Sequence, residues 1–235
     1  MIAALDNPMF FIALTVGAYW LGTIIQKKTQ LVFLNPILLA MLFIIGFLML
    51  TGIDYEVYHV NSEFINMLLQ PAIVCLAVPL YRQFKRIKQQ AWLIVMSSFL
   101  GCVTGIISVV LIAWSMGAPK EVVFSMAPKS VTTPIAMDVS RVIGGIPSLT
   151  AGVVIFVGIF GAMFGYLIMK LFKVNNPISQ GFSIGMASHA LGTSKSMEIS
   201  PSFGAFSTVG LIVNGILTAI LAPVIIQVLS YFIDF

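Results

Sequence analysis

Long apolar runs separated by short polar interruptions fill this 235-residue chain. Six runs have the length of membrane-spanning helices, at about residues 9–25, 31–50, 64–81, 91–114, 149–171 and 205–232. Segments 116–147 and 175–203 are too polar for ordinary lipid-facing helices, yet each contains short apolar stretches. The pattern predicts an all-α polytopic membrane protein with about six spans plus two re-entrant or broken helical segments.

Composition supports this class, because 59% of the residues are hydrophobic and only 9% are charged. A soluble domain of this size would need several times more charge, and a transmembrane barrel would alternate in polarity over short segments. The net charge is +4, but in a membrane protein the placement of Lys and Arg mainly encodes orientation, so no nucleic-acid partner is expected. Cys75 and Cys102 lack CxxC or Cys/His spacing and are expected to be small buried side chains. No metal or cofactor is expected.

The basic loops predict the orientation of the chain. QKKTQ follows the first run and YRQFKRIKQQ follows the third, so both are expected in the cytoplasm. TGIDYEVYHVNSE, which lies between runs two and three, carries three acids and no Lys or Arg, so it is expected outside. The N-terminus is then also outside. It has no basic region or cleavage site of a secretory signal, so the first run is expected to remain.

An internal repeat links the two polar segments. MAPKSVTTPIAMDVS (126–140) aligns without gaps, at an offset of 60, with MASHALGTSKSMEIS (186–200). Asp138 and Glu198 fall on equivalent positions, although the chain holds only eight acids. Matching interrupted segments are a pointer to a transporter's binding site. We therefore expect a three-span scaffold at residues 1–90 and a transport core at 91–235. The core would contain repeat units 91–150 and 151–210 and a final span.

Two topologies of the polar segments remain open. If each is a re-entrant hairpin, the span at 149–171 delivers Lys170 and Lys173 to the cytoplasm, as the positive-inside rule prefers. If each crosses as a broken helix, those lysines lie outside and Arg141 lies inside. The charge count favours hairpins, and a unit of one span plus one hairpin makes the repeat inverted. The simpler alternative is that both segments are solvated surface loops.

The interrupted segments predict a site for an anion. Pro134 fits the first turn of a helix at about 134–143, with Thr132 or Thr133 as N-cap. Gly192, Thr193 and Ser194 would precede a second helix that begins near Lys195. Two opposed helix N-termini with hydroxyls and lysines suit a small carboxylate. The candidate substrate-binding residues are Lys129, Ser130, Thr132, Thr133, His189, Gly192, Thr193, Ser194 and Lys195.

Other polar and small residues have alternatives. Asp138 and Glu198 either form structural ion pairs with Arg141 and Lys195 or couple transport to a proton or cation. GFSIG at 181–185 matches G-x-S-x-G, but a nucleophile elbow needs a strand-to-helix turn, so no enzyme is expected. Three glycines of the span at 149–171 predict close helix packing, either within the fold or at a dimer interface, and these are Gly158, Gly161 and Gly165.

MAPKSVTTPIAM, the following GGIPSLTAG and SHALGTSKSMEIS resemble the LrgB/CidB family of bacterial inner-membrane proteins, and the resemblance covers nearly the whole chain. A plant relative of that family is the plastid glycolate/glycerate translocator. The resemblance implies two activities. One is holin- or antiholin-like modulation of murein hydrolase export and cell lysis, with a small LrgA/CidA-type partner. The other is secondary transport of small 2-hydroxymonocarboxylates such as glycolate, glycerate or lactate.

The embedded charges and interrupted helices favour the carrier, because a holin-like pore does not need them. We expect alternating access by the repeat core against an N-terminal scaffold, which would also be the interface of a homodimer. The substrate class comes from the family resemblance. Coupling to protons, to sodium or to neither stays open.

Overall fold

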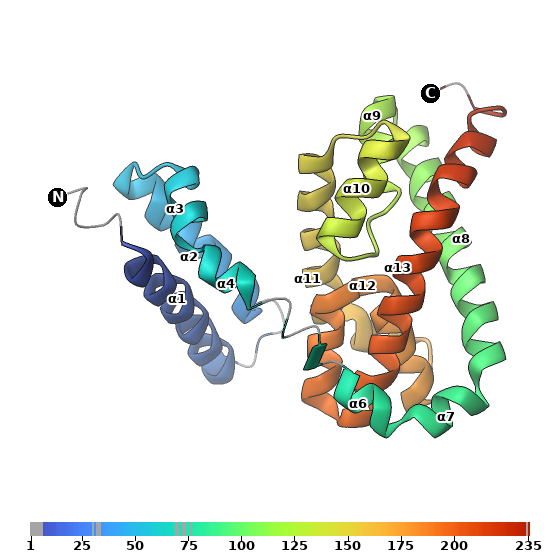
Figure 1. Cartoon of the computed structure of the whole chain (residues 1–235), viewed down its shortest axis with the longest axis horizontal. Helices are drawn as coiled ribbons and strands as arrows, with labels where there is room; N and C mark the ends of the chain where they lie inside the picture. The colour runs from blue at the N-terminus through green and yellow to red at the C-terminus, as the bar shows by residue number, and fades with distance from the viewer. Residues whose placement is uncertain are drawn as a thin grey trace. The chain divides into compact units, whose positions relative to one another are not determined.

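The computed structural model describes residues 7–29, 31, 34–68, 71, 74–75, 77–233 and 235. They form two compact units, Met1–Ala77 and Val78–Phe235. Every regular element in the described ranges is a helix, which confirms the predicted all-α class (Figure 1). Among these residues, four helices are long and apolar enough to cross a membrane by length and composition. They are α1 (Pro8–Thr29), α8 (Ala91–Ser115), α11 (Pro147–Leu171) and α13 (Pro201–Leu229).

The first unit is built on two apolar helices, α1 and α2 (Pro36–Thr51), followed by the short α3 (Tyr55–Asn61) and α4 (Glu63–Met67). Asn35 caps α2 by accepting a hydrogen bond from the Ile37 amide, and Gly52 ends it in the left-handed conformation. Residues 69–70, 72–73 and 76 of the predicted span at 64–81 lie outside the described residues. Cys75 is exposed within this unit, so its expected burial is wrong, while Cys102 of the second unit is buried.

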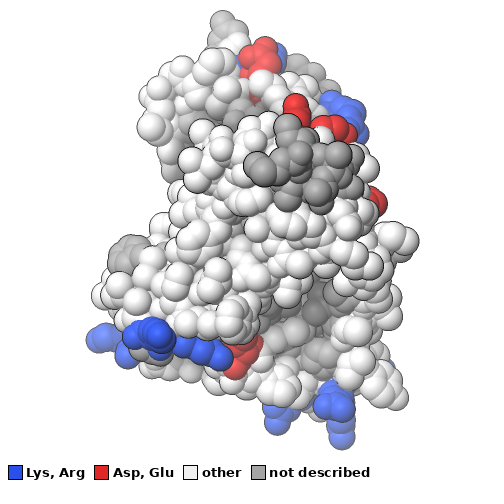
Figure 2. All heavy atoms as spheres, turned by 90° about the vertical axis from the view of Figure 1, so that its left-hand side faces the viewer, with Lys and Arg blue, Asp and Glu red and all other residues white. Residues whose placement is uncertain are grey.

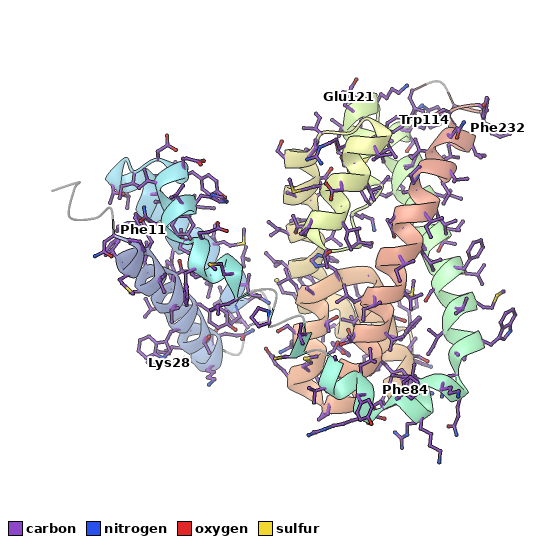
Figure 3. All side chains as sticks on the ribbon, in the orientation of Figure 1. Phe11, Lys28, Phe84, Trp114, Glu121 and Phe232 are labelled. Carbon is purple, nitrogen blue, oxygen red and sulfur yellow. The ribbon has the colours of Figure 1, made fainter. Side chains whose placement is uncertain are left out.

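The second unit contains three long helices, α8, α11 and α13, and α8 is preceded by α6 (Ala77–Arg82) and α7 (Phe84–Gln89). The shorter elements between the long helices are α9 (Lys120–Met126), α10 (Thr133–Ile143) and α12 (Pro177–Ile199). Phe84 lies at one end of this unit, and Trp114, Glu121 and Phe232 lie at the other (Figure 3). We call these the α7 end and the α9 end. Both α8 and α13 run from the α7 end to the α9 end, and α11 returns.

Two helical hairpins enter this unit from opposite ends (Figure 1). Hairpin 1 consists of α9, the turn at 127–132 and α10, and it lies at the α9 end. Hairpin 2 is α12, whose two arms meet at Ser188 and His189, and it lies at the α7 end. The longest arm is about 16 Å at 1.5 Å per residue, roughly half of a hydrocarbon core of about 30 Å. Neither hairpin can therefore cross the membrane. The pair formed by α8 and hairpin 1 runs in the opposite direction to the pair formed by α11 and hairpin 2.

The helix starts agree with the sequence in one hairpin only. In hairpin 1, α10 begins at Thr133 with Thr132 as N-cap and Pro134 in its first turn. In hairpin 2, the predicted helix start near Lys195 is wrong, because the second arm begins directly after His189. The reversal is made by the positive φ of His189, 43°, so Gly192 is not needed for the turn. Gly192 instead packs closely, since a Cβ there would lie 2.7 Å from Ser188 Cβ.

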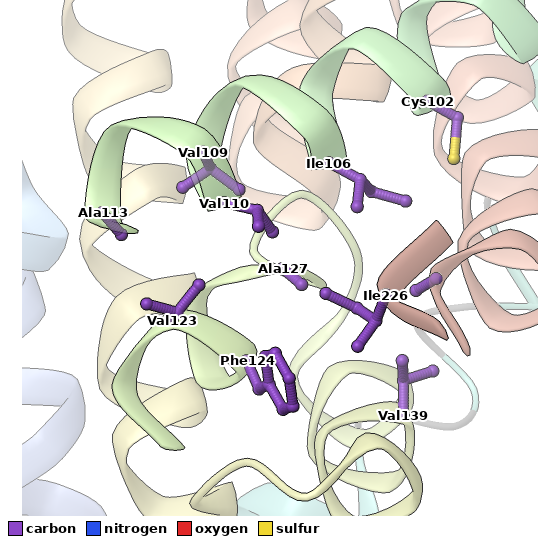
Figure 4. Close-up of a cluster of buried hydrophobic side chains, with 11 residues drawn as sticks. Cys102, Ile106, Val109, Val110, Ala113, Val123, Phe124, Ala127, Val139 and Ile226 are labelled. Carbon is purple, nitrogen blue, oxygen red and sulfur yellow. The ribbon is translucent and has the colours of Figure 1, made fainter. Parts of the chain in front are cut away.

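Each hairpin packs against α8, α11 and α13. Hairpin 1 shares an apolar cluster with α8 and α13, including Ile106, Phe124 and Ile226 (Figure 4). At the α7 end, Ile94 of α8, Phe182 of hairpin 2 and Phe206 of α13 form a second cluster. Most of the surface visible in Figure 2 carries no charged side chain. This agrees with a protein whose outer surface faces lipid.

Candidate functional site

The turn of hairpin 1 places one polar pair between buried residues. Pro128 and Val131 are fully buried and fix the turn on both sides. Lys129 and Ser130 between them are half-buried, and Lys129 Nζ donates a hydrogen bond of 3.1 Å to Ser130 Oγ. The N-cap residue Thr132 makes no side-chain capping bond. The turn is therefore anchored by apolar packing while its polar side chains remain accessible.

The turn of hairpin 2 faces into the protein. The ring of His189 is buried, and its Nε2 lies 2.9 Å from the carbonyl oxygen of Val154 on α11, which accepts the bond from a protonated Nε2. Thr193 Oγ1 donates to the His189 carbonyl at 2.8 Å and lies 3.0 Å from Ser207 Oγ of α13. These contacts fix hairpin 2 against its neighbours. They do not leave His189 or Thr193 free for a ligand.

Asn214, at the middle of α13, joins the two hairpins. Its amide nitrogen donates to the Ser130 carbonyl at 3.1 Å and to the Met186 carbonyl at 2.9 Å. Both acceptors are carbonyl oxygens, so the amide orientation is fixed by chemistry. Its Oδ1 has no hydrogen-bond partner within the described part of the chain. Asn214 was not among the residues predicted from the sequence, although a lone Asn in an apolar run was the available signal.

A central cavity of about 280 Å³ lies where the two hairpins approach α8 and α13. Its polar lining consists of Ser97, Ser130, Ser183, Asn214 and Thr218. Its remaining lining residues are Gly101, Cys102, Ile106, Ala127, Phe182, Met186 and Ala187. The cavity is therefore uncharged, with hydroxyl groups and one amide on apolar walls, which is the usual chemistry of a small-molecule site.

The structure does not gather the predicted site residues into one place. Of the nine, Ser130 alone lines the central cavity. Lys129 lines a second cavity, Thr132 and Thr133 are half-buried at the start of α10, and Ser194 is exposed. His189, Gly192 and Thr193 are buried in the packing of hairpin 2. Lys195 forms an ion pair with Glu198.

Asp138 and Glu198 form the ion pairs that were one of the two alternatives predicted for them. Asp138 Oδ1 lies 2.8 Å from Arg141 Nη1, and Glu198 Oε2 lies 2.8 Å from Lys195 Nζ. The Asp138 and Glu198 side chains are 74% and 58% exposed, so neither acid faces the central cavity. Among the described residues, no three His, Cys, Asp or Glu side chains are placed to hold a metal.

The glycines singled out in the sequence serve helix packing within the fold. A Cβ at Gly158 would lie 2.6 Å from the His189 ring, and one at Gly161 would overlap Ser188. In GFSIG, a Cβ on Gly185 would lie 2.6 Å from the Ser207 carbonyl carbon. The motif lies on the first arm of α12, where Ser183 is exposed and lines the cavity. It is a helix-packing motif in this setting, not a strand-to-helix elbow.

Long apolar helices, two opposed re-entrant hairpins and an uncharged cavity lined by both hairpins define a polytopic membrane protein with a central small-molecule cavity. Within that class, the chain belongs to the LrgB-like family, which it matches over residues 15–228. This confirms the resemblance found in the sequence. No solved structure matches the chain.

Relatives match almost the full length of the chain. An uncharacterized protein of Haemophilus influenzae is 39% identical, with 94% of this chain and 95% of the relative covered. The antiholin-like protein LrgB of Bacillus subtilis is 36% identical, with 95% and 97% covered. The holin-like protein CidB of Staphylococcus aureus is 34% identical, with 94% and 96% covered. The latter two names fit the holin-like alternative and do not describe transport.

Proposed function

We propose that the protein is a secondary carrier of small monocarboxylates that works by alternating access. The observation that carries this proposal is the bridge from Asn214 to the turn of hairpin 1 and to the first arm of hairpin 2, beside an uncharged cavity with a few polar groups. In secondary transporters, the binding site usually lies near the membrane midplane, where interrupted helices of two inverted repeats meet. A pore built from self-associating helices has no need for such a bridge.

The chemistry of the central cavity suits a 2-hydroxy acid. The hydroxyls of Ser130 and Ser183 can donate to a carboxylate, while Asn214 Oδ1 can accept from a substrate hydroxyl. A volume of about 280 Å³ accommodates a molecule the size of glycolate, glycerate or lactate and excludes a folded protein. The choice among these acids rests on the family's relationship to the plastid glycolate/glycerate translocator.

The proposed setting is the bacterial inner membrane, with the α7 end in the cytoplasm. Arg82, Lys85, Arg86 and Lys88 lie in α6 and α7, and Lys170 and Lys173 lie where α11 returns to that end. This distribution follows the positive-inside rule for the hairpin topology. An outside N-terminus, a homodimer and a small LrgA/CidA-type partner belong to the same proposal.

The second candidate is a holin- or antiholin-like protein that modulates murein hydrolase export. It is favoured by the names of the Bacillus subtilis and Staphylococcus aureus relatives. The two candidates differ in the solute path. A carrier shows saturable uptake and counterflow of one substrate class, whereas a pore leaks unrelated solutes without saturation.

The test uses purified full-length protein in liposomes. We expect saturable uptake and counterflow of radiolabelled glycolate, glycerate or lactate, with no leakage of a trapped dye. Asn214→Leu keeps the side-chain size but removes both bridging bonds, so it should lower uptake at least about tenfold. Thr208→Val is the matched control, because its hydroxyl bonds only to the Gly204 carbonyl of its own helix. Dye leakage, or full uptake by Asn214→Leu, would contradict the proposal.

A further inference from the structure

A second cavity of about 430 Å³ follows the central cavity along α8. Residues from Ser97 to Ile106 of α8 line the central cavity, and residues from Ser108 to Met116 line the second. Because a helix rises about 1.5 Å per residue, the middles of these two stretches are about 16 Å apart along the axis. The two cavities therefore lie in tandem, one towards each end of the unit.

The turn of hairpin 1 separates the two cavities. Ala127 and Ser130 line the central cavity, whereas Met126 and Lys129 line the second. The bond from Lys129 Nζ to Ser130 Oγ thus joins a wall of one cavity to a wall of the other. Ser130 is held from behind, since its carbonyl accepts a bond from Asn214. Opening of this bond would therefore require movement of the Lys129 side chain.

Lys129 is the single charged side chain among the described residues that line either cavity. The rest of the second cavity is apolar except for Ser108. A cation on such walls attracts anions strongly, because the surrounding dielectric constant is low. Its one bond to a neutral hydroxyl leaves ammonium donors available for a carboxylate.

We propose that Lys129 and Ser130 form a gate between the two cavities and that Lys129 selects anions at this gate. The inference rests on the carrier function proposed above, and it assigns that carrier's charge selectivity to a position outside the central cavity. A carboxylate in the second cavity binds the Lys129 ammonium and breaks its bond to Ser130. The carboxylate can then pass to the central cavity, which Ser130 and Asn214 line.

Cysteine accessibility tests the gate without measuring transport. In a Cys75→Ser, Cys102→Ser background whose thermal unfolding matches the parent, Ser108→Cys reports on the second cavity and Ser183→Cys on the central one. With Lys129 present, a membrane-impermeant thiol reagent should label Ser108→Cys from the α9 side and Ser183→Cys from the α7 side. With Lys129→Ala, labelling should lose its sidedness. Labelling of either cysteine from both sides while Lys129 is present would overturn the gate.

Reagents of opposite charge test the selectivity. At Ser108→Cys, an anionic methanethiosulfonate should react faster than a cationic one, and Lys129→Gln should lower this rate ratio about tenfold. Lys129→Arg should preserve it. Lys120→Gln is the matched control, because Lys120 lies on the same hairpin, over the Phe124 ring, and lines neither cavity. An unchanged ratio in Lys129→Gln would remove the assignment of selectivity to Lys129.

Transport then separates the two proposals. If no uptake is found but the labelling remains sided and charge-dependent, the carrier proposal is contradicted and the anion-selective gate is retained. If Lys129→Gln takes up glycolate at the parental rate, the carrier proposal is retained and the gate proposal is contradicted.

Discussion

The two hairpins contain the aligned segments 126–140 and 186–200 but are fastened by different interactions. Hairpin 1 is held to α11 by hydroxyl groups, since Thr150 Oγ1 lies within hydrogen-bond distance of the Ser125 carbonyl, at 3.0 Å, and of Ser140 Oγ, at 2.7 Å. Hairpin 2 also has side-chain bonds, from His189 and Thr193, but in addition its glycines bring its backbone against that of α13. A Cβ on Gly181 or Gly185 would collide with the α13 backbone at Phe203 or Ser207.

The difference teaches which hairpin can move. Hydrogen bonds between side chains can exchange partners at a cost of about 1 kcal/mol each in a membrane protein. Backbone contact through glycine has no such flexibility, because separating the helices exposes the whole interface. Hairpin 2 therefore resembles a fixed part of the framework, and hairpin 1, which carries Lys129, is the better candidate for a moving element.

The largest expected effect comes from Gly185→Ala, compared with Ser125→Ala at the equivalent position of hairpin 1. The added methyl would meet the Ser207 backbone, so we expect a loss of about 3 kcal/mol in the free energy of unfolding. Ser125→Ala removes the acceptor of the Ile146 amide and should cost about 1–2 kcal/mol. Thermal unfolding in detergent measures both.

Gly152→Ala on α11 is the control for that experiment, because nothing lies within 4 Å of the Cβ it would add. It should leave the unfolding temperature nearly unchanged. If Gly185→Ala were no more destabilising than Ser125→Ala, the distinction between a backbone-packed and a hydroxyl-bonded hairpin would be lost.

Much of the fold could be predicted from the sequence, since long apolar runs and the Thr-Thr-Pro start of α10 act locally. The hairpins themselves were favoured by the expectation that Lys170 and Lys173 lie on the cytoplasmic side. The start of the second arm of α12 could not be predicted. A positive φ at a histidine is locally unfavourable, and it is held here by contacts to Val154 and Thr193 from separate parts of the chain.

The candidate site was harder to predict than the fold. Hydroxyls and cations near an interrupted helix mark a polar region, but they do not say which way each side chain points. His189 turned towards α11 because Gly158 leaves room for its ring. Asn214 gave a weaker signal, since one polar residue in an apolar run can be a simple packing residue. Only the arrangement of α13 beside both turns distinguishes these cases.

A moderate effect is expected from Thr150→Val, which tests the hydroxyl network of hairpin 1 alone. The substitution preserves the branched shape but leaves the Ser125 carbonyl and Ser140 Oγ without their partner. We expect a loss of about 1–2 kcal/mol in the free energy of unfolding. Thr208→Val should lower the free energy of unfolding by less, because the Thr208 hydroxyl bonds only within α13. Equal unfolding temperatures for the two variants would mean that the network does not fasten hairpin 1.

The smallest effect is expected where the two hairpins are most alike, at the ion pairs of Asp138 and Glu198. Both pairs join residues three apart on one helix and both acids are largely exposed, so each pair should contribute less than about 0.5 kcal/mol.

Asp138→Asn and Glu198→Gln should therefore leave both the unfolding temperature and the pH dependence of glycolate uptake close to those of the parent. The measurement is uptake at a series of external pH values with sodium held constant. A carrier whose pH dependence disappeared in either variant would assign a coupling role to that acid, and it would show that one hairpin binds the coupling ion. If both variants keep the parental pH dependence of uptake, the hairpins differ in their packing and in Lys129, and not in the role of their acids.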